Sequence, residues 1–178
     1  MVMKKKKLVI GAIIQARCNS IRLPNKVLFE INNVPCIEIL VKRLQKSKKL
    51  KKIIVATTTK KTDDKLVKFL KEKNILYYRG SENNVLKRYL FASKKFKINT
   101  VVRVTGDSPL VDPKIVDKFI GFYLKQKVDF VSEGPSPTFP DGIGVEIFSS
   151  EILKKTITET NSMFDLEHVT PFVKRSKL

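Results

Sequence analysis

The fold is decided by residues 8–26, which read LVIGAIIQARCNSIRLPNK. Leu8–Ala16 is an apolar run of strand length, and it predicts a first strand covered on both faces of a sheet. The loop that follows carries three cations within ten residues, Arg17, Arg22 and Lys26. These cations can neutralise a triphosphate, while small polar residues between them let backbone N–H groups approach it. An ordinary basic surface loop is the alternative, and the Gly-Lys-Ser/Thr element of a Walker loop is absent.

Strand and helix patterns alternate along the rest of the chain. Further strands are expected at residues 53–57, 75–78, 100–105, 128–132 and 145–148. Apolar side chains at helical spacing predict helices that contain residues 37–44, 66–70, 85–96 and 116–123. Thr62 is expected to cap the second helix, and Asp112-Pro113 supplies the cap and first residue of the fourth. The alternation predicts a single α/β domain with a mostly parallel sheet and helices on both faces.

The chain is strongly basic, with 36 lysines and arginines against 17 acidic residues and a formal net charge of +19. Such a charge is typical of proteins with a nucleic-acid or polyanion partner. However, only seven of the basic residues are arginine, the residue that makes bidentate contacts with phosphates and bases. The lysines are spread over the expected outer faces of several helices. Solvated helix faces therefore explain the charge better, and a nucleic-acid partner is not expected.

Neither the cysteines nor the termini indicate export or a membrane. Cys18 and Cys36 have no metal-ligand spacing, and two cysteines do not make a disulfide scaffold, which favours the reduced cytoplasm. Lys4–Lys7 precede a short apolar run as in a signal peptide, but no cleavage site follows. The run is also too short to span a membrane. The final Ser176-Lys177-Leu178 matches a peroxisomal address, which we interpret as accidental.

A second polar cluster, Thr105-Gly106-Asp107-Ser108, directly follows the strand expected at residues 100–105. Ligands of open parallel sheets bind outside the carboxyl ends of the strands, so residues at this position are informative. The Asp107 carboxylate is placed where it can hold Mg²⁺ against phosphate oxygens. A simple turn is the alternative, because glycine, aspartate and serine are all turn formers.

Six sequence blocks occur in an order that resembles a known family: QARCNSIRLPNK (15–26), VATTT (55–59), RGSENNVLKRY (79–89), VRVTGDSPLVDP (102–113), FPDGIGVEIFS (139–149) and EHVTPF (167–172). From residue 10 to 172 the chain is similar to the cytidylyltransferases that activate acidic sugars as CMP conjugates. The nearest group is the spore-coat polysaccharide type, whose relatives include the CMP-Kdo and CMP-sialic acid synthetases. The resemblance implies a three-layer, Rossmann-like nucleotidyltransferase fold, a cytoplasmic enzyme and a homodimer.

The resemblance also implies roles for residues at matching positions. Phosphate ligands are implied at Arg17, Arg22 and Lys26, with Ser20 in the same loop and backbone groups of Gln15 and Ala16 beside the nucleoside. The implied surroundings of the base are Thr57, Thr58, Ser81 and Arg88, and Gly106 adjoins the magnesium ligand Asp107. The residues expected to face the acceptor sugar are Asp141, Glu146, Glu167 and His168. For His168, a surface or helix-end residue is the alternative to a catalytic one.

The implied reaction joins CMP from CTP to a hydroxyl of an acidic sugar in cell-surface polysaccharide biosynthesis. The hydroxyl attacks the α-phosphorus of CTP in line, and pyrophosphate leaves. Mg²⁺ on Asp107 would orient the α-phosphate, stabilise charge and acidify the attacking hydroxyl. Arg17, Arg22 and Lys26 would stabilise the departing pyrophosphate. The expected catalytic residues are Arg17, Lys26 and Asp107.

Two departures from the family pattern limit these expectations. Gly144 stands where relatives commonly carry an aspartate, which removes a carboxylate from the expected sugar side. The chain also ends at Leu178, before an acidic block that completes the metal site in relatives. We therefore expect one domain over residues 1–178 whose C-terminal part is missing. A catalytically incomplete nucleotide-binding module is the alternative to an active enzyme, and a UTP- or GTP-dependent sugar-phosphate nucleotidyltransferase is disfavoured by the order of the blocks.

Overall fold

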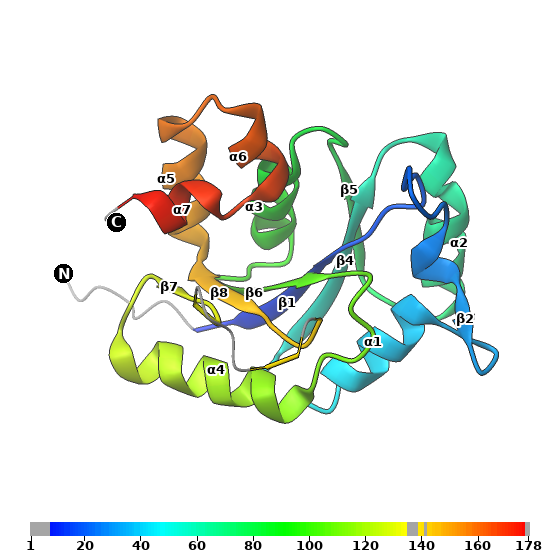
Figure 1. Ribbon diagram of the computed structural model, residues 1–178, viewed down its shortest axis with the longest axis horizontal. Helices are drawn as coiled ribbons and strands as arrows, with labels where there is room; N and C mark the ends of the chain where they lie inside the picture. Colours follow the sequence, from blue (N-terminus) through cyan, green and yellow to red (C-terminus); the bar gives the residue numbers. More distant parts are fainter. Residues whose placement is uncertain (1–7, 135–138, 141, 177–178) are drawn as a thin grey trace.

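The computed structural model describes residues 8–134, 139–140 and 142–176, which form a six-stranded sheet between layers of helices (Figure 1). The strands lie in the order β5-β4-β1-β6-β8-β7. Four of them run parallel, namely β1 (Ile10–Gln15), β4 (Lys52–Thr58), β5 (Tyr77–Gly80) and β6 (Thr100–Thr105). β8 (Glu146–Ser149) is antiparallel to β6, and β7 (Phe130–Val131) is antiparallel to β8. The prediction of a mostly parallel sheet is confirmed.

Helices cover both faces of the sheet, as predicted (Figure 1). One layer consists of α1 (Cys36–Leu44), α2 (Asp64–Glu72) and α4 (Pro113–Gln126). The other consists of α3 (Val85–Lys95), α5 (Ser150–Glu159), α6 (Met163–His168) and α7 (Pro171–Arg175). Ala12 and Ile14 of β1 pack into the core under the first layer, whereas Ile13 packs under the second. Successive side chains of a strand point to opposite faces, so an apolar β1 requires both layers.

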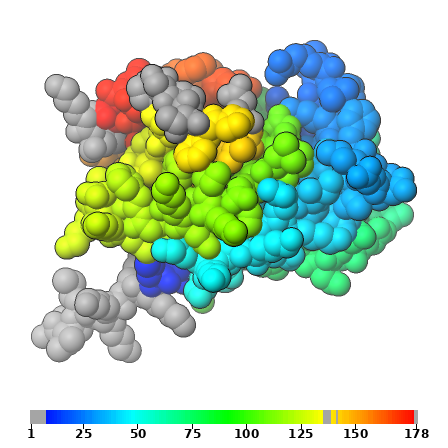
Figure 2. Space-filling model, turned by 60° about the horizontal axis from the view of Figure 1, so that its bottom comes forward, coloured from blue at the N-terminus to red at the C-terminus, as the bar shows by residue number. Residues whose placement is uncertain are grey.

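Asp117 of α4 links this helix to the turn that follows α1. Its carboxylate accepts hydrogen bonds from the Ser47 hydroxyl at 2.5 Å and from the Lys48 N–H at 2.9 Å, both in the turn after α1. Figure 2 shows this face, where α4 (yellow-green) lies beside the segment that follows α1 (cyan). None of the helices in the described part of the chain is long and apolar enough to cross a membrane.

The start of α2 differs from the prediction. Thr62 does not cap this helix, because it lies inside the 3-10 turn η2 (Lys61–Asp63), and α2 begins at Asp64 with Asp63 in the N-cap position. The cap predicted at Asp112 is confirmed, since its side chain accepts hydrogen bonds from the N–H groups of Lys114 and Ile115.

Short elements and the C-terminal helices escaped the prediction. The structure adds the 3-10 turn η1 (Lys26–Leu28) and a hairpin of β2 (Glu30–Ile31) and β3 (Val34–Pro35). It also adds α5, α6 and α7, and it shifts the third parallel strand from residues 75–78 to Tyr77–Gly80. Apart from α5, which has ten residues, these elements are two to six residues long and carry too few side chains to show a periodicity in the sequence.

Candidate functional site

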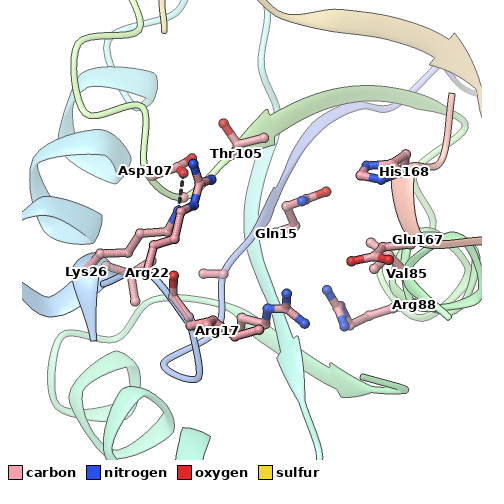
Figure 3. A pocket seen from close by; sticks show the side chains of 15 residues that line it. Gln15, Arg17, Arg22, Lys26, Val85, Arg88, Thr105, Asp107, Glu167 and His168 are labelled. Carbon is pink, nitrogen blue, oxygen red and sulfur yellow. Dashed lines mark hydrogen bonds and ion pairs between the residues drawn. The ribbon is translucent and has the colours of Figure 1, made fainter. Parts of the chain in front are cut away.

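A cavity of about 450 Å³ opens at the carboxyl ends of β1 and β6 (Figure 3). Its lining comes from the loop after β1, the turn after β6, and helices α3 and α6: Gln15, Ala16, Arg17, Ser20, Ile21, Arg22, Lys26, Val27, Val85, Arg88, Thr105, Gly106, Asp107, Glu167 and His168. Arginine and lysine supply four of these residues, against one aspartate and one glutamate. This cavity, called the first cavity from here on, therefore favours an anionic ligand.

The loop after β1 closes around the backbone of Cys18. The Cys18 carbonyl accepts hydrogen bonds from the N–H of Ser20 at 3.0 Å and from the N–H of Asn25 at 2.8 Å. Asn25 has a left-handed backbone with φ 62°, a conformation that asparagine adopts more readily than most residues. Because the loop turns back at this point, Lys26 lines the same cavity as Arg17 (Figure 3).

Arg88 reaches the first cavity from α3 (Figure 3). Its Nη1 donates to the Ser81 carbonyl at 2.5 Å, while its Nε is buried without a hydrogen-bond partner among the described residues. Burial lowers the pKa of Arg88, with Tyr89 acting in the opposite direction and the charge of Arg17 lowering it further. The guanidinium groups of Arg17 and Arg88 point toward each other in Figure 3. Two such cations are stabilised by an anion placed between them.

Asp107 lies on the turn after β6 and forms an ion pair with Lys26 (Figure 3). Burial raises the pKa of the Asp107 carboxyl, but hydrogen bonds from Lys26 and Thr105 and the charge of Lys26 outweigh it, so the pKa is lowered. The carboxylate is thus ionised at neutral pH. Within the described ranges, no three His, Cys, Asp or Glu side chains gather closely enough to hold a metal ion. A divalent cation at Asp107 would need further oxygen ligands from a bound phosphate.

Gly106 brings the ends of β1 and β6 together beneath the cavity. Its N–H donates to the Gln15 carbonyl at 2.8 Å. A Cβ atom at position 106 would lie 2.9 Å from that carbonyl oxygen and 3.0 Å from the Cβ of Ala16, closer than packed atoms normally approach. A glycine is therefore required where the two strands converge.

Gln15 enters the cavity with its side chain (Figure 3). Its carbonyl is bonded to Gly106, and the neighbouring Ala16 N–H donates to the Ala56 carbonyl at 3.1 Å, so these two backbone groups are used inside the sheet. The Oε1 of Gln15 accepts hydrogen bonds from Arg103 at 3.2 Å and from the Tyr89 hydroxyl at 3.4 Å. The carboxamide is held in one orientation as a result.

A comparison with known sequences decides the family. The pattern of the family described as cytidylyltransferase matches residues 11–178. This chain belongs to the cytidylyltransferase family. A solved structure of a cytidylyltransferase from Leptospira borgpetersenii has a TM-score of 0.90 and 32% sequence identity, and the match covers 96% of this chain and 72% of that one. The Rossmann-like nucleotidyltransferase fold is thereby confirmed.

Two relatives are longer proteins that this chain matches over part of their length. An uncharacterised protein of Methanocaldococcus jannaschii is 41% identical over 165 residues, which are 93% of this chain and 66% of the relative. The spore coat polysaccharide biosynthesis protein SpsF of Bacillus subtilis is 33% identical over 168 residues, which are 91% of this chain and 68% of SpsF. The predicted resemblance to the spore-coat group is confirmed, and the chain spans about two thirds of the length of these relatives.

The first cavity gathers most of the residues that the sequence placed at the nucleotide. Those in the lining are Gln15, Ala16, Arg17, Ser20, Arg22, Lys26, Arg88, Gly106 and Asp107. Glu167 and His168, expected on the acceptor side, line it too. His168 is also the last residue of α6, and its ring packs against Phe164 with centroids 4.4 Å apart. The helix-end position foreseen as the alternative for His168 is therefore observed.

Three residues expected around the base are not part of the lining of the first cavity. Thr57 and Thr58 are buried at the end of β4, and both hydroxyls donate hydrogen bonds to Asp63. Ser81 uses its carbonyl to hold Arg88 and its hydroxyl to accept a hydrogen bond from the Asn84 N–H at 3.0 Å. The polar groups of Thr57 and Thr58 are thus paired inside the fold, whereas Ser81 is exposed outside the first cavity.

Glu146 lies in a second cavity, of about 280 Å³, that shares Thr105 with the first. Its carboxylate pairs with Arg103 at 2.6 Å and with Lys174 at 2.7 Å. Burial raises the pKa of Glu146, but the charges and hydrogen bonds of Arg103 and Lys174 outweigh it and hold the pKa below its ordinary value. Glu146 is thus separated from Glu167 and His168. Asp141, the remaining acceptor residue expected from the sequence, lies outside the described residues.

A carboxylate from elsewhere in the chain stands beside Gly144. Glu133 lines the second cavity, and a Cβ atom at position 144 would collide with the Glu133 carboxylate. One oxygen of that carboxylate, Oε1, is buried with no hydrogen-bond partner in the part of the chain that the structure describes. Glu133 therefore occupies the space that a side chain at position 144 would need.

Arg103, which connects the two cavities, carries no role expected from the sequence. Its Nη2 donates to Gln15 in the first cavity and its Nη1 to Glu146 in the second. The available signal was an arginine within the apolar strand Thr100–Thr105, because a charged residue in a buried strand is almost always paired. Its partners, however, are far away in the sequence and carry no local pattern.

Proposed function

We propose that the first cavity binds CTP and that CMP is transferred to a hydroxyl of an acidic sugar, with release of pyrophosphate. The observation that carries the proposal is the set of four cations that line this cavity in a cytidylyltransferase-family chain, Arg17, Arg22, Lys26 and Arg88. The relative SpsF, a spore coat polysaccharide biosynthesis protein, supports a place in polysaccharide assembly.

The cations have separate tasks in this proposal. Arg17, Arg22 and Lys26 lie on the loop after β1, where they bind the β- and γ-phosphates and stabilise the charge that develops on the leaving pyrophosphate. Arg88 stands across the cavity and contributes the positive charge of its guanidinium group to the nucleotide site. Lys26 pairs with Asp107 in the structure, so phosphate binding exchanges one anionic partner of Lys26 for another.

The residues present fit a magnesium ion that arrives with the nucleotide. Asp107 offers one ionised carboxylate at the cavity, and Mg²⁺ is commonly bound by one or two carboxylates together with substrate phosphates and waters. A bound Mg²⁺ would supply Lewis-acid stabilisation of the transferred phosphoryl group. The task of the protein is to hold Asp107 at the strand end, which the turn after β6 does.

The second cavity is where we place the acceptor sugar. Thr105 lines both cavities, so a sugar in the second one lies next to the strand end that carries Asp107. Lys174, whose side chain is half-exposed, offers an ammonium group for an acidic substituent, and the Glu133 carboxylate in the lining offers an acceptor for sugar hydroxyls. Glu146 is already neutralised by Arg103 and Lys174 and serves to hold those cations in place.

Pyrophosphate release tests this function. The full chain is incubated with CTP and either 3-deoxy-manno-octulosonate or N-acetylneuraminate as acceptor, with and without Mg²⁺. We expect pyrophosphate only when Mg²⁺, CTP and an acidic sugar are all present, and no release with UTP or GTP. CTP binding is measured in parallel by calorimetry. A chain that does not bind CTP would contradict the proposal.

A nucleotide-binding module without turnover is the second candidate. It is favoured by the single carboxylate, Asp107, that stands next to the loop cations, and by the lack of a three-residue metal cluster among the described residues. Intact CTP binding without any acceptor-dependent pyrophosphate release would support it over the enzyme.

A further inference from the structure

Asp63 is buried behind the loop after β1, with 1% of its surface exposed. Its Oδ1 accepts a hydrogen bond from the Cys18 N–H at 2.7 Å. Its Oδ2 accepts from the Thr57 hydroxyl at 3.0 Å, from the Thr58 N–H at 3.1 Å and from the Thr58 hydroxyl. A single carboxylate therefore joins the end of β4 to the loop that carries the phosphate-binding cations.

The group that Asp63 holds is the centre of that loop. The carbonyl of Cys18 closes the loop by accepting hydrogen bonds from Ser20 and Asn25, and its N–H belongs to the peptide that follows Arg17. The Cys18 side chain is itself buried, and burial, together with the charge of Asp63, raises the pKa of its thiol to about 11. A neutral, inaccessible thiol is no nucleophile. Cys18 therefore serves the loop through its backbone.

The Asp63 side chain bonds to Cys18 instead of capping its own helix. This residue occupies the N-cap position of α2, where an aspartate normally accepts a hydrogen bond from the first turn of its own helix. Its side chain makes no such bond and turns instead toward β4 and Cys18. A buried carboxylate is costly unless it is fully paired, and the four donors around Asp63 satisfy it.

We propose that Asp63 is a positioning residue for nucleotide binding: its carboxylate holds the loop after β1 in the conformation that presents Arg17, Arg22 and Lys26 to a triphosphate. The proposal rests on CTP binding in the first cavity. Asp63 itself is not in the lining of that cavity, so it acts through the backbone of Cys18.

The chemistry of the site demands an aspartate rather than an asparagine. Each carboxylate oxygen faces a backbone N–H, that of Cys18 on one side and that of Thr58 on the other. A backbone N–H can only donate, whereas the amide of asparagine presents one acceptor and one donor. The variant Asp63→Asn must therefore set its NH₂ group against one of the two N–H groups, although it has the same shape.

The experiment compares the affinities of CTP and CMP by calorimetry in the presence of Mg²⁺, for the wild type, Asp63→Asn and Asp64→Asn. Asp64 is the matched control, because it is the next residue, pairs with Arg79 at 2.7 Å and has a side chain that is 58% exposed. We expect Asp63→Asn to weaken CTP by about tenfold or more, the equivalent of losing one hydrogen bond to a charged group, with CMP changed by less than about twofold. Asp64→Asn leaves both affinities at the wild-type level.

The split between the two nucleotides separates positioning from a general loss of structure. Wild-type CTP affinity in Asp63→Asn, or an equal loss for CTP and CMP, overturns the proposal. If Asp63→Asn does not fold, Thr58→Val carries the test, because it removes one hydroxyl donor and keeps the shape. We expect a smaller loss in Thr58→Val, confined to CTP, and an unchanged CTP affinity there also overturns the proposal. A wild-type chain that does not bind CTP rejects the proposed function itself, and this inference with it.

Discussion

At Asp107 a single carboxylate stands beside Lys26 at the mouth of the cavity, and the two form an ion pair. The sequence could place this residue only at the end of a strand. The structure shows that Lys26 is its partner and that the pKa of the Asp107 carboxyl is lowered. It also shows that, among the described residues, no group of three His, Cys, Asp or Glu side chains could hold a metal ion. If Mg²⁺ arrives with CTP, Asp107 contributes to turnover far more than to nucleotide affinity.

The variant Asp107→Asn tests this division of labour. We expect acceptor-dependent pyrophosphate release to fall by at least about a hundredfold, because a metal ligand that stabilises the transition state is lost. CTP affinity should change by no more than about fivefold, the value of an exposed ion pair. Asp129→Asn, on an exposed residue outside the cavity, is the control. Full activity in Asp107→Asn would show that the metal assignment is wrong.

The elements β1 and β6 converge at the cavity, and Gly106 permits their approach. Their ends are joined by the hydrogen bond from Gly106 to the Gln15 carbonyl, and the lining residues of both strands depend on this spacing. The neighbouring strand β8 is antiparallel, so its first residue, Glu146, lies at the same edge of the sheet, opposite Arg103. Strand order and direction therefore set which polar side chains meet.

The variant Gly106→Ala should destabilise the fold. Its Cβ would meet the Gln15 carbonyl at 2.9 Å, an atom of the backbone that has no freedom to move aside. We expect the free energy of unfolding in urea to drop by about 1–3 kcal/mol. Gly121→Ala is the matched control, because a Cβ there approaches only the flexible end of Lys49, at 3.1 Å. In helix α4 this control should gain about 0.5–1 kcal/mol, and equal effects of the two substitutions would contradict the packing argument.

At the scale of the whole molecule, 17 acidic residues are set against 36 basic ones, and several of the few carboxylates hold the elements together. Asp63 joins β4 to the loop after β1, and Glu146 joins β6 and β8 to α7. Asp165 of α6 accepts hydrogen bonds from Arg175 at 2.8 Å and from Thr160 at 2.7 Å, although its carboxylate is buried. Acid should therefore weaken the fold by protonating these groups.

The pH dependence of stability follows from the lowered pKa of Asp165. The hydrogen bond from Arg175 lowers this pKa and outweighs burial, which raises it. The unfolded chain, with an ordinary aspartate pKa of about 4, takes up the proton first as the pH falls. The stabilisation is therefore complete above about pH 4 to 5 and is lost as the pH falls through the folded-state pKa.

The measurement is the free energy of unfolding in urea between pH 7 and pH 3. We expect the wild type to lose stability below about pH 4 and Asp165→Asn, which is less stable at pH 7, to lose less over the same interval. Glu159→Gln, which removes an exposed carboxylate at the end of α5, should reproduce the wild-type profile. Identical profiles for the wild type and Asp165→Asn would contradict the role of this buried pair.

The sequence by itself determined the layered α/β fold, the family and most of the first cavity. The apolar run of Leu8–Ala16, the strand and helix periodicities and the cations of the following loop are local patterns. They place Arg17 and Asp107 just after strands, and Lys26 in the loop that follows the first one. The cap at Asp112 is local as well. These local features depend on neighbours within a few residues, which is the range over which a periodicity can be detected, whereas the family follows from the order of six blocks along the chain.

Only the tertiary structure decided which polar groups are partners across the fold. Asp63 meets Cys18 across 45 residues, and Arg103 meets Gln15 and Glu146 across 88 and 43 residues. Thr57 and Thr58 were expected in the lining of the first cavity. Their hydroxyls instead donate hydrogen bonds to Asp63, and neither residue is part of that lining. The side chain of Glu133, eleven residues away in the sequence, occupies the space beside Gly144. A buried polar group must find a partner, and which partner it finds depends on the order and direction of the strands that bring distant segments together.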